Sequence, residues 1–213
     1  MRRSRRLPLE ALAPYLLELP AEARPVVWHG IFGNDHPIEI EVGFGKGLFL
    51  LENSQARPNV NFLGIEIERK YQLFTATRLA KRNLTNVRVL CADARRVLAE
   101  QVPAASVQAV HVYFPDPWWK HRHQKRRVFT PAFAAACARV LLPSGLLYLI
   151  SDVEAYYQVM RETVARETAL IEEPWLEVTG DEGRTNFERK YRREGRPIYR
   201  VLYRQVGGPD ARR

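Results

Sequence analysis

The sequence contains little cysteine: Cys91 and Cys137 are the two in 213 residues. They form no Cys-x-x-Cys pair, so they offer no zinc framework and favour inert thiols in a reducing compartment. Long apolar runs are also missing, and no stretch approaches the length that crosses a bilayer. The basic stretch at 2–6 (RRSRR) is followed by prolines and glutamates rather than an apolar core, so no signal peptide is expected. These absences predict a cytoplasmic protein without a membrane segment.

Acidic residues are outnumbered, with 24 Asp and Glu against 33 Lys and Arg, giving a formal net charge of +9. A surface of this charge favours a polyanionic partner, and nucleic acid is the first to consider. Basicity alone is also compatible with simple solubility, so the placement of the cations has to decide. The length, with a hydrophobic content of 46%, suits one domain that buries its own core.

From residue 38 onward, short apolar runs alternate with amphipathic segments. The runs predict strands at 38–44, 61–67, 87–92, 107–114 and 146–151, and the segments between them predict helices at 46–55, 69–82, 94–101, 131–141 and 153–168. Such alternation indicates βαβ units and therefore a parallel sheet with helices on both faces. Two further strands, at 175–179 and 198–206, are expected to close the sheet as an antiparallel edge. The first 37 residues are expected to form a short helix and a loop outside the core.

The first expected strand leads into a glycine-rich loop, EVGFGKG at 41–47, before a helix. Glycines at Gly43, Gly45 and Gly47 allow a sharp turn and a close approach to a ligand, and the helix offers free N–H groups. In an open parallel sheet this loop lies at the carboxyl ends of the strands, where ligands bind. A tight turn that binds nothing would give the same pattern, so the loop needs support from other residues.

Two acids at the ends of the next strands give that support. Glu66 ends the second expected strand and can accept hydrogen bonds from a ribose diol, whereas Asp93 follows the third and can receive an adenine amino group or cap a helix. The loop reads Gly-x-Gly-x-Gly rather than the Gly-x-Gly-x-x-Gly of dinucleotide sites, and Glu41 beside it would repel a pyrophosphate. We therefore expect S-adenosylmethionine, an adenosyl cofactor without phosphates, rather than NAD.

The fourth expected strand ends in FPDPWWK at 114–120, and HRHQKRR follows at 121–127. Prolines and an aspartate do not belong in a strand, and Pro115 and Pro117 restrict the backbone around Asp116. The first and fourth strands of a doubly wound sheet are neighbours. Asp116 is therefore expected beside the glycine loop, across the crevice from Glu41.

The aromatic and basic residues of this block favour an RNA substrate. Trp118 and Trp119 can stack on a base, and the cations after them can pair with phosphates. His121 and His123 have the spacing of a metal pair, but no third ligand is nearby and the neighbours are cationic, so no metal is expected. The stretch 184–204 is also rich in Arg, Lys and aromatic residues, which favours RNA contact, although a solvated edge strand has a similar composition.

These motifs closely resemble those of the bacterial tRNA (guanine-N7)-methyltransferase family. The matching stretches are IFGNDHP at 31–37, IEIEVGFGKG at 38–47, FLGIEI at 62–67, CADA at 91–94, FPDPWWKHRHQKRR at 114–127, SDVEAYY at 151–157 and TNFERK at 185–190. The resemblance covers nearly the whole chain beyond residue 28, and the Pro-Asp-Pro-Trp block is its specific part. It implies an α/β, Rossmann-like class I methyltransferase with a mostly parallel seven-stranded sheet, helices on both faces and an antiparallel edge strand.

The resemblance also implies an activity, which is methyl transfer from S-adenosylmethionine to N7 of guanosine 46 in the variable loop of tRNA. Together with the glycine loop, it gives the expected cofactor site as Glu41, Gly43, Gly45, Gly47, Glu66, Asp93 and Asp116, with Asp116 also the catalytic position. The implied substrate contacts are Lys120, Asp152, Thr185, Asn186, Phe187 and Glu188. The expected organisation is a basic arm with a short helix at 1–37, one methyltransferase domain at 38–206 and a tail at 207–213.

The chemistry of guanine N7 is consistent with these residues, because this nitrogen carries a lone pair and no hydrogen. No proton has to be removed, so we expect Asp116 to orient rather than to act as a base, and positioning to supply the catalysis. Side chains cannot read the deep major groove of A-form RNA, so the target guanine is expected to be unpaired. Two alternatives stay open, an RNA-binding module of the same fold without catalysis and an NAD-dependent dehydrogenase. The sequence implies no obligate protein partner.

Overall fold

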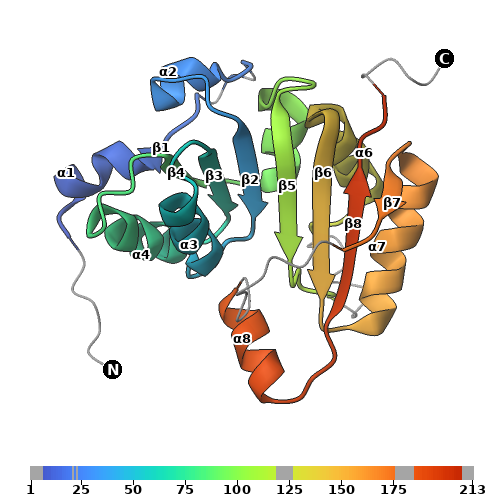
Figure 1. Cartoon of the computed structure of the whole chain (residues 1–213). Coiled ribbons are helices and arrows are strands. Elements are labelled where there is room, and N and C mark those ends of the chain that lie inside the picture. Colours follow the sequence, from blue (N-terminus) through green and yellow to red (C-terminus); the bar gives the residue numbers. More distant parts are fainter. Residues whose placement is uncertain (1–6, 21, 23, 119–126, 176–184, 208–213) are drawn as a thin grey trace.

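The computed structural model describes residues 7–20, 22, 24–118, 127–175 and 185–207, which form one twisted sheet with helices on both faces (Figure 1). Five parallel strands make up most of the sheet: β2 (Ile38–Val42), β3 (Asn61–Glu66), β4 (Val87–Cys91), β5 (Val107–Tyr113) and β6 (Leu141–Ser151). The strand order is β1-β4-β3-β2-β5-β6-β8-β7, so the direction of winding reverses between β2 and β5. The predicted α/β sheet with neighbouring first and fourth strands is confirmed.

The five predicted parallel strands agree with the structure to within two residues, except at the start of β6. This strand begins at Leu141, ahead of the predicted 146, and its pairing with β5 is irregular between Val107 and Ala109. Ser144, within it, has a φ of +65°. The irregular start breaks the two-residue alternation of buried side chains, so the sequence pattern indicated only the regular second half.

The antiparallel edge consists of β7 (Ile171–Glu173) and β8 (Tyr199–Arg204). β8 pairs antiparallel with both β6 and β7, which confirms the strand predicted at 198–206. β7 precedes the strand predicted at 175–179, and most of that predicted stretch lies outside the described residues.

The N-terminal segment contributes more than the sequence indicated. It forms α1 (Leu9–Leu12), a 3-10 turn η1 (Ala13–Tyr15), the two-residue strand β1 (Leu16–Leu17) and α2 (Trp28–Phe32). β1 pairs with β4, so the sheet has eight strands rather than seven. Leu12 and Tyr15 are buried in the core, so the expectation that this segment lies outside the core is wrong there. A strand of two residues is too short to show a periodic pattern.

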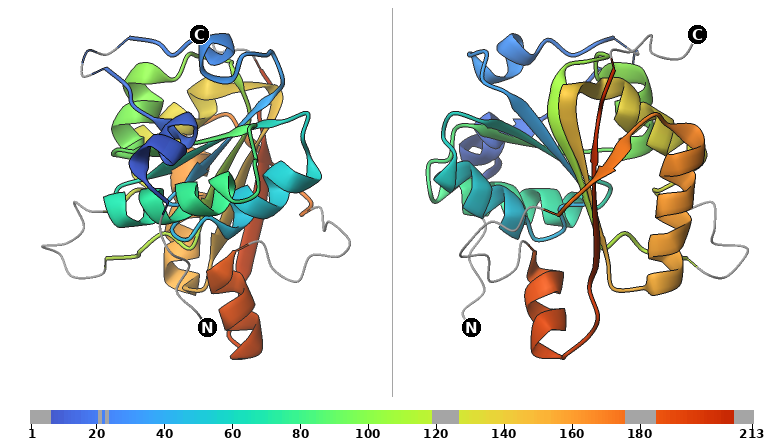
Figure 2. Two further views of the ribbon diagram at one scale, coloured as in Figure 1. Left: turned by 90° about the vertical axis from the view of Figure 1, so that its left-hand side faces the viewer. Right: turned by 45° about the vertical axis from the view of Figure 1, so that its right-hand side comes forward.

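The other helices form the two outer layers, and all five that were predicted are confirmed (Figure 2). On one face, α3 (Leu48–Ala56) and α4 (Arg69–Ala80) share a core cluster with α1. On the other face lie α5 (Ala94–Arg96), the π-helical turn η2 (Val97–Gln101), α6 (Pro131–Val140) and α7 (Glu154–Glu167), around a second cluster. No helix in the described ranges is long and apolar enough to span a membrane.

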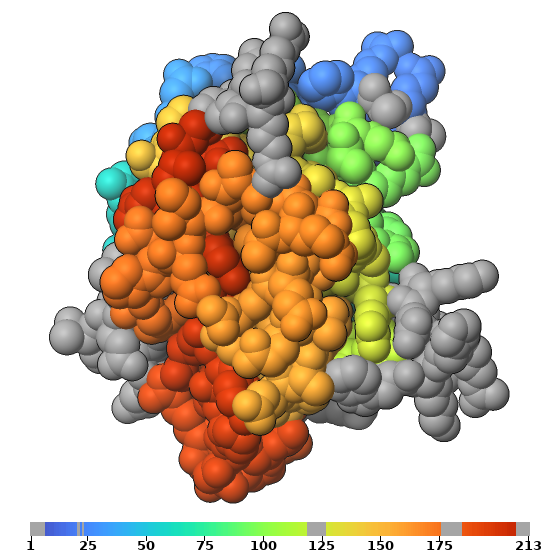
Figure 3. All heavy atoms as spheres, turned by 90° about the vertical axis from the view of Figure 1, so that its right-hand side faces the viewer, coloured from blue at the N-terminus to red at the C-terminus, as the bar shows by residue number. Residues whose placement is uncertain are grey.

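One helix was missed by the sequence analysis, α8 (Asn186–Arg193), which lies in the stretch interpreted as an RNA contact or an edge strand. The hydroxyl oxygen of Thr185 accepts a hydrogen bond from the backbone N–H of Glu188 at 3.1 Å. Ser or Thr followed three residues later by Glu is a known helix start, so the sequence did contain this indication. α8 lies beyond the carboxyl ends of the parallel strands (Figure 1), and its segment projects from the molecular surface (Figure 3).

Candidate active site

The four predicted acids lie along one edge of the sheet because parallel strands end on the same side. β4, β3, β2 and β5 are neighbours in that order, and their ends carry the acids in the order Asp93, Glu66, Glu41 and Asp116. The reversal of strand order falls between the last two. The sheet topology therefore brings the predicted cofactor acids and the predicted catalytic aspartate to the point where the strand order reverses, which is where open α/β sheets bind ligands and which we call the crevice.

The glycine loop follows β2 and has three left-handed glycines, with φ of +73° at Gly43, +50° at Gly45 and +65° at Gly47. A Cβ on Gly47 would lie 2.3 Å from Cγ2 of Thr75, so this glycine lets α4 approach the start of α3. A Cβ on Gly43 or Gly45 would meet nothing within 4 Å. The loop therefore leaves open space beside its backbone, which a ligand can occupy.

Glu66 shapes this loop. One carboxylate oxygen accepts a hydrogen bond from the N–H of Gly45 at 3.0 Å, and the other accepts from the N–H of Glu68 at 3.1 Å. The side chain is buried, with 9% exposed. Each carboxylate oxygen can accept a further hydrogen bond, so Glu66 can hold the loop and still receive a ribose hydroxyl.

Glu41 is also buried, and among the described residues its Oε2 has no hydrogen-bond partner. Burial, together with the charge of Glu66, raises the pKa of Glu41 to about 8. An unpartnered buried carboxylate is unfavourable unless a ligand completes its interactions. A bound cation would favour the ionised form and complete its interactions, so Glu41 fits the positive charge expected of S-adenosylmethionine.

Asp93 forms the N-cap of α5, where its Oδ1 accepts a hydrogen bond from the N–H of Arg95 at 2.9 Å. The guanidinium of Arg95 also pairs with the Asp93 carboxylate, with 2.6 Å between Nη2 and Oδ2. The hydrogen bond from Arg95 is the main cause that lowers the pKa of Asp93. The capping role is confirmed, and a bound adenine would share this carboxylate with Arg95.

Asp116 is exposed and lies in a loop whose backbone is strained on both sides. Phe114 has a φ of +52° and Trp118 a φ of +41°, which non-glycine residues adopt at a cost of about 1–3 kcal/mol each. Arg127, expected from the sequence only as one of the phosphate-binding cations, donates from Nε to the carbonyl oxygen of Pro117 at 2.6 Å. Its guanidinium also lies 5.4 Å from the ring centroid of Tyr156. The loop is therefore fixed by a contact between side chain and backbone as well as by its prolines.

The predicted substrate contacts divide into exposed and buried residues. Asn186 and Phe187 are exposed on α8, whereas Thr185 and Glu188 are buried. Glu188 pairs with cations of α8 and β8 and so attaches the helix to the sheet. Asp152, which follows β6, forms an ion pair with a cation beyond α8.

Several predicted residues lie outside the described part of the chain, namely Lys120, Trp119, His121 and His123. Across the ranges that the structure describes, no group of three or more His, Cys, Asp or Glu could hold a metal ion.

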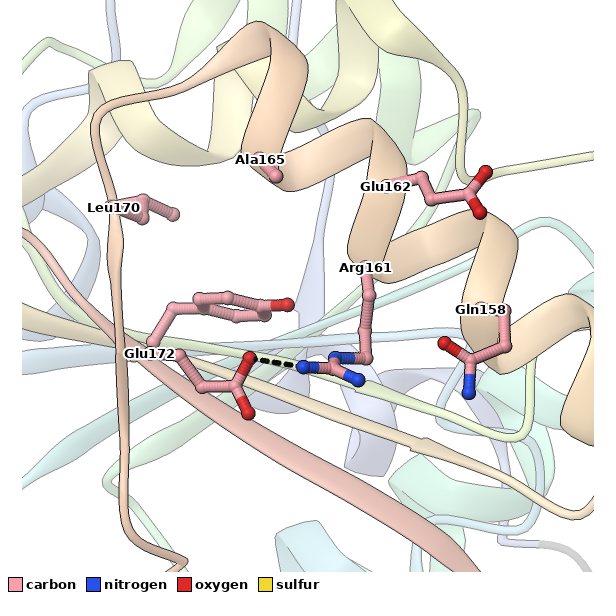
Figure 4. A pocket seen from close by; sticks show the side chains of 7 residues that line it. Gln158, Arg161, Glu162, Ala165, Leu170 and Glu172 are labelled. Carbon is pink, nitrogen blue, oxygen red and sulfur yellow. Dashed lines mark hydrogen bonds and ion pairs between the residues drawn. The ribbon is translucent and has the colours of Figure 1, made fainter.

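A pocket of about 370 Å³ lies elsewhere, between α7 and the β7–β8 edge (Figure 4). Its lining is Gln158, Arg161, Glu162, Ala165, Leu170, Glu172 and Tyr203, none of which belongs to the predicted site. Arg161 pairs with Glu172 at 2.7 Å, so its charge is balanced. We assign this pocket no binding role.

A family model described as "Putative methyltransferase" matches residues 35–201. A tRNA (guanine-N(7)-)-methyltransferase of Rhodopirellula baltica is 42% identical, over 82% of this chain and 68% of the relative. One of the same name from Alkalilimnicola ehrlichii is 37% identical, over 94% of this chain and 86% of the relative.

Solved structures show the same fold at low sequence identity. The 16S rRNA methyltransferase KamB has a TM-score of 0.60 and 15% identity, and the match covers 85% of this chain and 93% of that one. A SAM-dependent methyltransferase from Aquifex aeolicus has a TM-score of 0.54 and 15% identity, over 81% and 85%. The fold is that of the class I methyltransferases, as the sequence predicted.

Proposed function

Because the chain belongs to the tRNA (guanine-N7)-methyltransferase family, we propose that it transfers the methyl group of S-adenosylmethionine to N7 of a guanosine in tRNA. The observation that carries the proposal is the buried carboxylate of Glu41, whose Oε2 has no hydrogen-bond partner among the described residues. It lies beside an open glycine loop, at the strand end next to Asp116. This arrangement suits a cationic adenosyl ligand. We further propose guanosine 46 of the variable loop as the target and the cytoplasm as the location.

The cofactor site consists of Glu41, Gly43, Gly45, Gly47, Glu66 and Asp93 in this proposal. S-adenosylmethionine, when bound, supplies an electrophilic methyl group on a positively charged sulfur. Glu41 balances the positive charge, and Glu66 offers its remaining acceptor sites to the ribose hydroxyls. Asp93 receives the adenine amino group, and Gly43 and Gly45 provide the open space beside the backbone.

Asp116 acts by orientation. The lone pair of guanine N7 lies in the plane of the ring and carries no proton, so no residue has to act as a base. The exposed carboxylate of Asp116 can accept hydrogen bonds from N1–H and the 2-amino group of guanine, which holds the base in one orientation at the crevice. Orientation of this kind can lower a barrier by about 7–11 kcal/mol in favourable cases.

The substrate residues act in two ways. Asn186 and Phe187 are exposed on α8 and available to tRNA, whereas Thr185 and Glu188 act indirectly by building and anchoring that helix. Asp152 supports the same region through its ion pair with Arg196. Lys120 remains a predicted phosphate contact.

The test is methyl transfer to unmodified tRNA, followed by chemical cleavage at N7-methylguanosine to map the site. We expect cleavage at position 46, and none in a transcript with adenosine at that position. Asp116→Asn should lower kcat by about 100-fold or more, since it removes the charged acceptor that orients the base. Normal turnover by this variant would show that Asp116 does not have the assigned role.

Two outcomes would favour the other functions. An RNA-binding module would be favoured if the protein binds tRNA but transfers no methyl group, whether or not it binds S-adenosylmethionine. A thermal shift caused by NAD and not by S-adenosylmethionine would favour a dehydrogenase.

A further inference from the structure

Three aromatic rings from distant parts of the sequence meet beyond the carboxyl end of β5. Phe114 follows that strand, and Phe187 and Tyr191 lie on α8. The ring centroid of Phe114 is 5.4 Å from that of Tyr191 and 6.2 Å from that of Phe187, and the two rings of α8 are 5.9 Å apart. We call these three residues the aromatic platform. It lies next to the predicted catalytic loop, because Phe114 precedes Asp116 by two residues.

The platform is not simply a part of the core. Phe187 leaves 52% of its surface exposed, although apolar surface is normally buried. Phe114 has a φ of +52°, a backbone conformation that is unfavourable for a phenylalanine. Strained, partly exposed residues cluster at ligand sites, where the surrounding structure holds them in place. Both features indicate a ligand with a flat apolar face.

α8, which carries two of the rings, is anchored at three places. Arg189 donates from Nη2 to both carboxylate oxygens of Glu52 on α3, at 2.8 Å each, and α3 begins at the glycine loop. The buried Glu188 pairs with Arg200 of β8. Arg196, after the helix, pairs with Asp152, which follows β6. These contacts give the rings a defined position relative to the crevice, as a binding surface requires.

The charges around the platform indicate which ligand it takes. The guanidinium of Arg196 lies 4.0 Å from the ring centroid of Tyr191, and Nζ of Lys190 lies 5.7 Å from the same centroid. Both cations also pair with acids, Arg196 with Asp152 and Lys190 with Glu194, so the rings are bordered by polar groups that are held in place. A flat aromatic face with such a polar border suits a nucleobase, whose ring stacks while its edge meets hydrogen-bonding groups. An apolar protein surface would gain nothing from this polar border.

We propose that the target guanine stacks on the aromatic platform, with Phe187 as the principal contact and Phe114 and Tyr191 as its support. This inference rests on the proposed function and names the residue that positions its substrate. The base then lies between the platform and the crevice, within reach of the Asp116 carboxylate, and its stacking on the protein replaces the stacking that it loses when it leaves the RNA.

The experiment compares Phe187→Ala with Phe187→Tyr, which keeps an aromatic ring. The matched control is Ile171→Ala on β7, which removes an apolar side chain of similar exposure, 53%, from the antiparallel edge of the sheet. We expect Phe187→Ala to lower kcat/KM for tRNA by about 5–150-fold, the range for one stacked base. Phe187→Tyr should stay within about threefold of the unchanged protein, and S-adenosylmethionine affinity should not change in any variant.

A second measurement detects stacking directly and does not depend on turnover. A tRNA with 2-aminopurine in place of the target guanosine should fluoresce more brightly when bound to Phe187→Ala than when bound to the unchanged protein or to Phe187→Tyr. Equal fluorescence in all three complexes, or unchanged kcat/KM in Phe187→Ala, would overturn the inference. A changed oligomeric state in Phe187→Ala with normal methylation would overturn it too, since the platform would then be a protein contact.

The failure of this inference can be told apart from failure of the proposed function. If the unchanged protein does not methylate guanine N7 in tRNA, the proposed function is wrong. If it does so and Phe187→Ala is equally active, only the role of the platform is wrong.

Discussion

At the scale of single residues, Glu39 and Glu41 show how partners decide the state of a buried carboxylate. Both are buried and, being two residues apart in β2, they lie on the same face of the sheet. Arg57 pairs with Glu39 at 2.6 Å and Nε2 of His111 lies 3.0 Å from it. Burial acts to raise the pKa of Glu39, but His111 and Arg57 outweigh it and lower that pKa to about 2. Glu41, whose Oε2 has no partner among the described residues, has its pKa raised to about 8.

The raised pKa of Glu41 predicts opposite effects of pH on stability and on cofactor affinity. An acid with a folded pKa of about 8 and an ordinary value of 4.5 contributes stability fully below pH 4.5 and loses it as the pH rises toward about 8. A cation bound beside Glu41 favours the ionised form, so S-adenosylmethionine should bind more tightly as the pH rises over that interval and should release a proton. Calorimetry in buffers of different ionisation enthalpy measures that proton.

Glu41→Gln should raise the free energy of unfolding of the ligand-free protein at pH 8, by an amount on the order of a few kcal/mol. The same variant should bind S-adenosylmethionine more weakly, and its affinity should no longer vary with pH over this interval. Glu39→Gln is the matched control and should lower stability at the same pH, because it leaves Arg57 and His111 with a neutral partner. Binding that releases no proton and does not vary with pH would mean that Glu41 does not face the positive charge of the cofactor.

At the scale of elements, the position of the loop that carries Asp116 depends on the contacts made at its ends. Pro115 and Pro117 restrict the backbone from within, and Arg127 binds the carbonyl oxygen of Pro117 from ten residues further along the chain. Arg127 also receives, at its own carbonyl oxygen, a 3.5 Å contact from Nη1 of Arg95, whose guanidinium pairs with Asp93. The loop of Asp116 and the predicted adenine-binding acid are therefore connected through two arginines.

This connection predicts that Arg127→Lys lowers kcat by about 10–100-fold, because an ammonium cannot reproduce the planar donor that holds Pro117. KM for tRNA should change less than kcat, since lysine keeps the positive charge that can pair with a phosphate. Steady-state kinetics with thermal unfolding on the same samples measures both effects.

Arg139→Lys gives a matched control for that variant. Nη2 of Arg139 donates to the carbonyl oxygens of Leu98 and Val102, at 2.6 and 2.7 Å, away from the crevice. Arg139→Lys should lower the melting temperature and leave kcat nearly unchanged. If Arg127→Lys behaved in the same way, its contact with Pro117 would be structural only.

At the scale of the whole molecule, a net charge of +9 favours tRNA, but many cations already have partners inside the fold. In the stretch 184–204, ion pairs join Arg189 to Glu52, Lys190 to Glu194, Arg192 and Arg200 to Glu188, Arg196 to Asp152, and Arg204 to Glu173. The number of basic residues there therefore overstates the charge available for phosphates. The anchoring of α8 accounts for part of that composition.

Affinity for tRNA should fall steeply with salt, by about 0.7 log units per phosphate contact for each tenfold rise in salt concentration, if the contacted strand is effectively single. Filter binding over a series of salt concentrations measures this slope. The affinity for S-adenosylmethionine, measured over the same series, should change little, because salt screens short-range interactions at a partly buried site only weakly. Binding of tRNA that does not respond to salt would contradict a charge-driven complex.

Local patterns in the sequence were enough to predict the five parallel strands from residue 38 onward, the glycine loop and the position of the acids along the chain. Strand and helix periodicity, glycine conformation and the effect of prolines act over a few residues, so Glu41, Glu66, Asp93 and Asp116 could be assigned to strand ends without the structure. α8 could also have been found, because Thr185 and Glu188 have the spacing of a helix cap. β1 could not, since Leu16 and Leu17 show no pattern of their own.

Which of these residues have partners depends on contacts that form only in the folded chain. Glu39 is neutralised by Arg57 and His111, which are 18 and 72 residues away, and Arg189 of α8 meets Glu52 across 137 residues. The arrangement of the Asp116 loop, which Arg127 holds at Pro117, and that of the aromatic platform also depend on such distant contacts. Only the folded sheet brings these segments together. Ion pairs and ring contacts act over a few ångströms, so the local sequence pattern does not show which distant residues will meet.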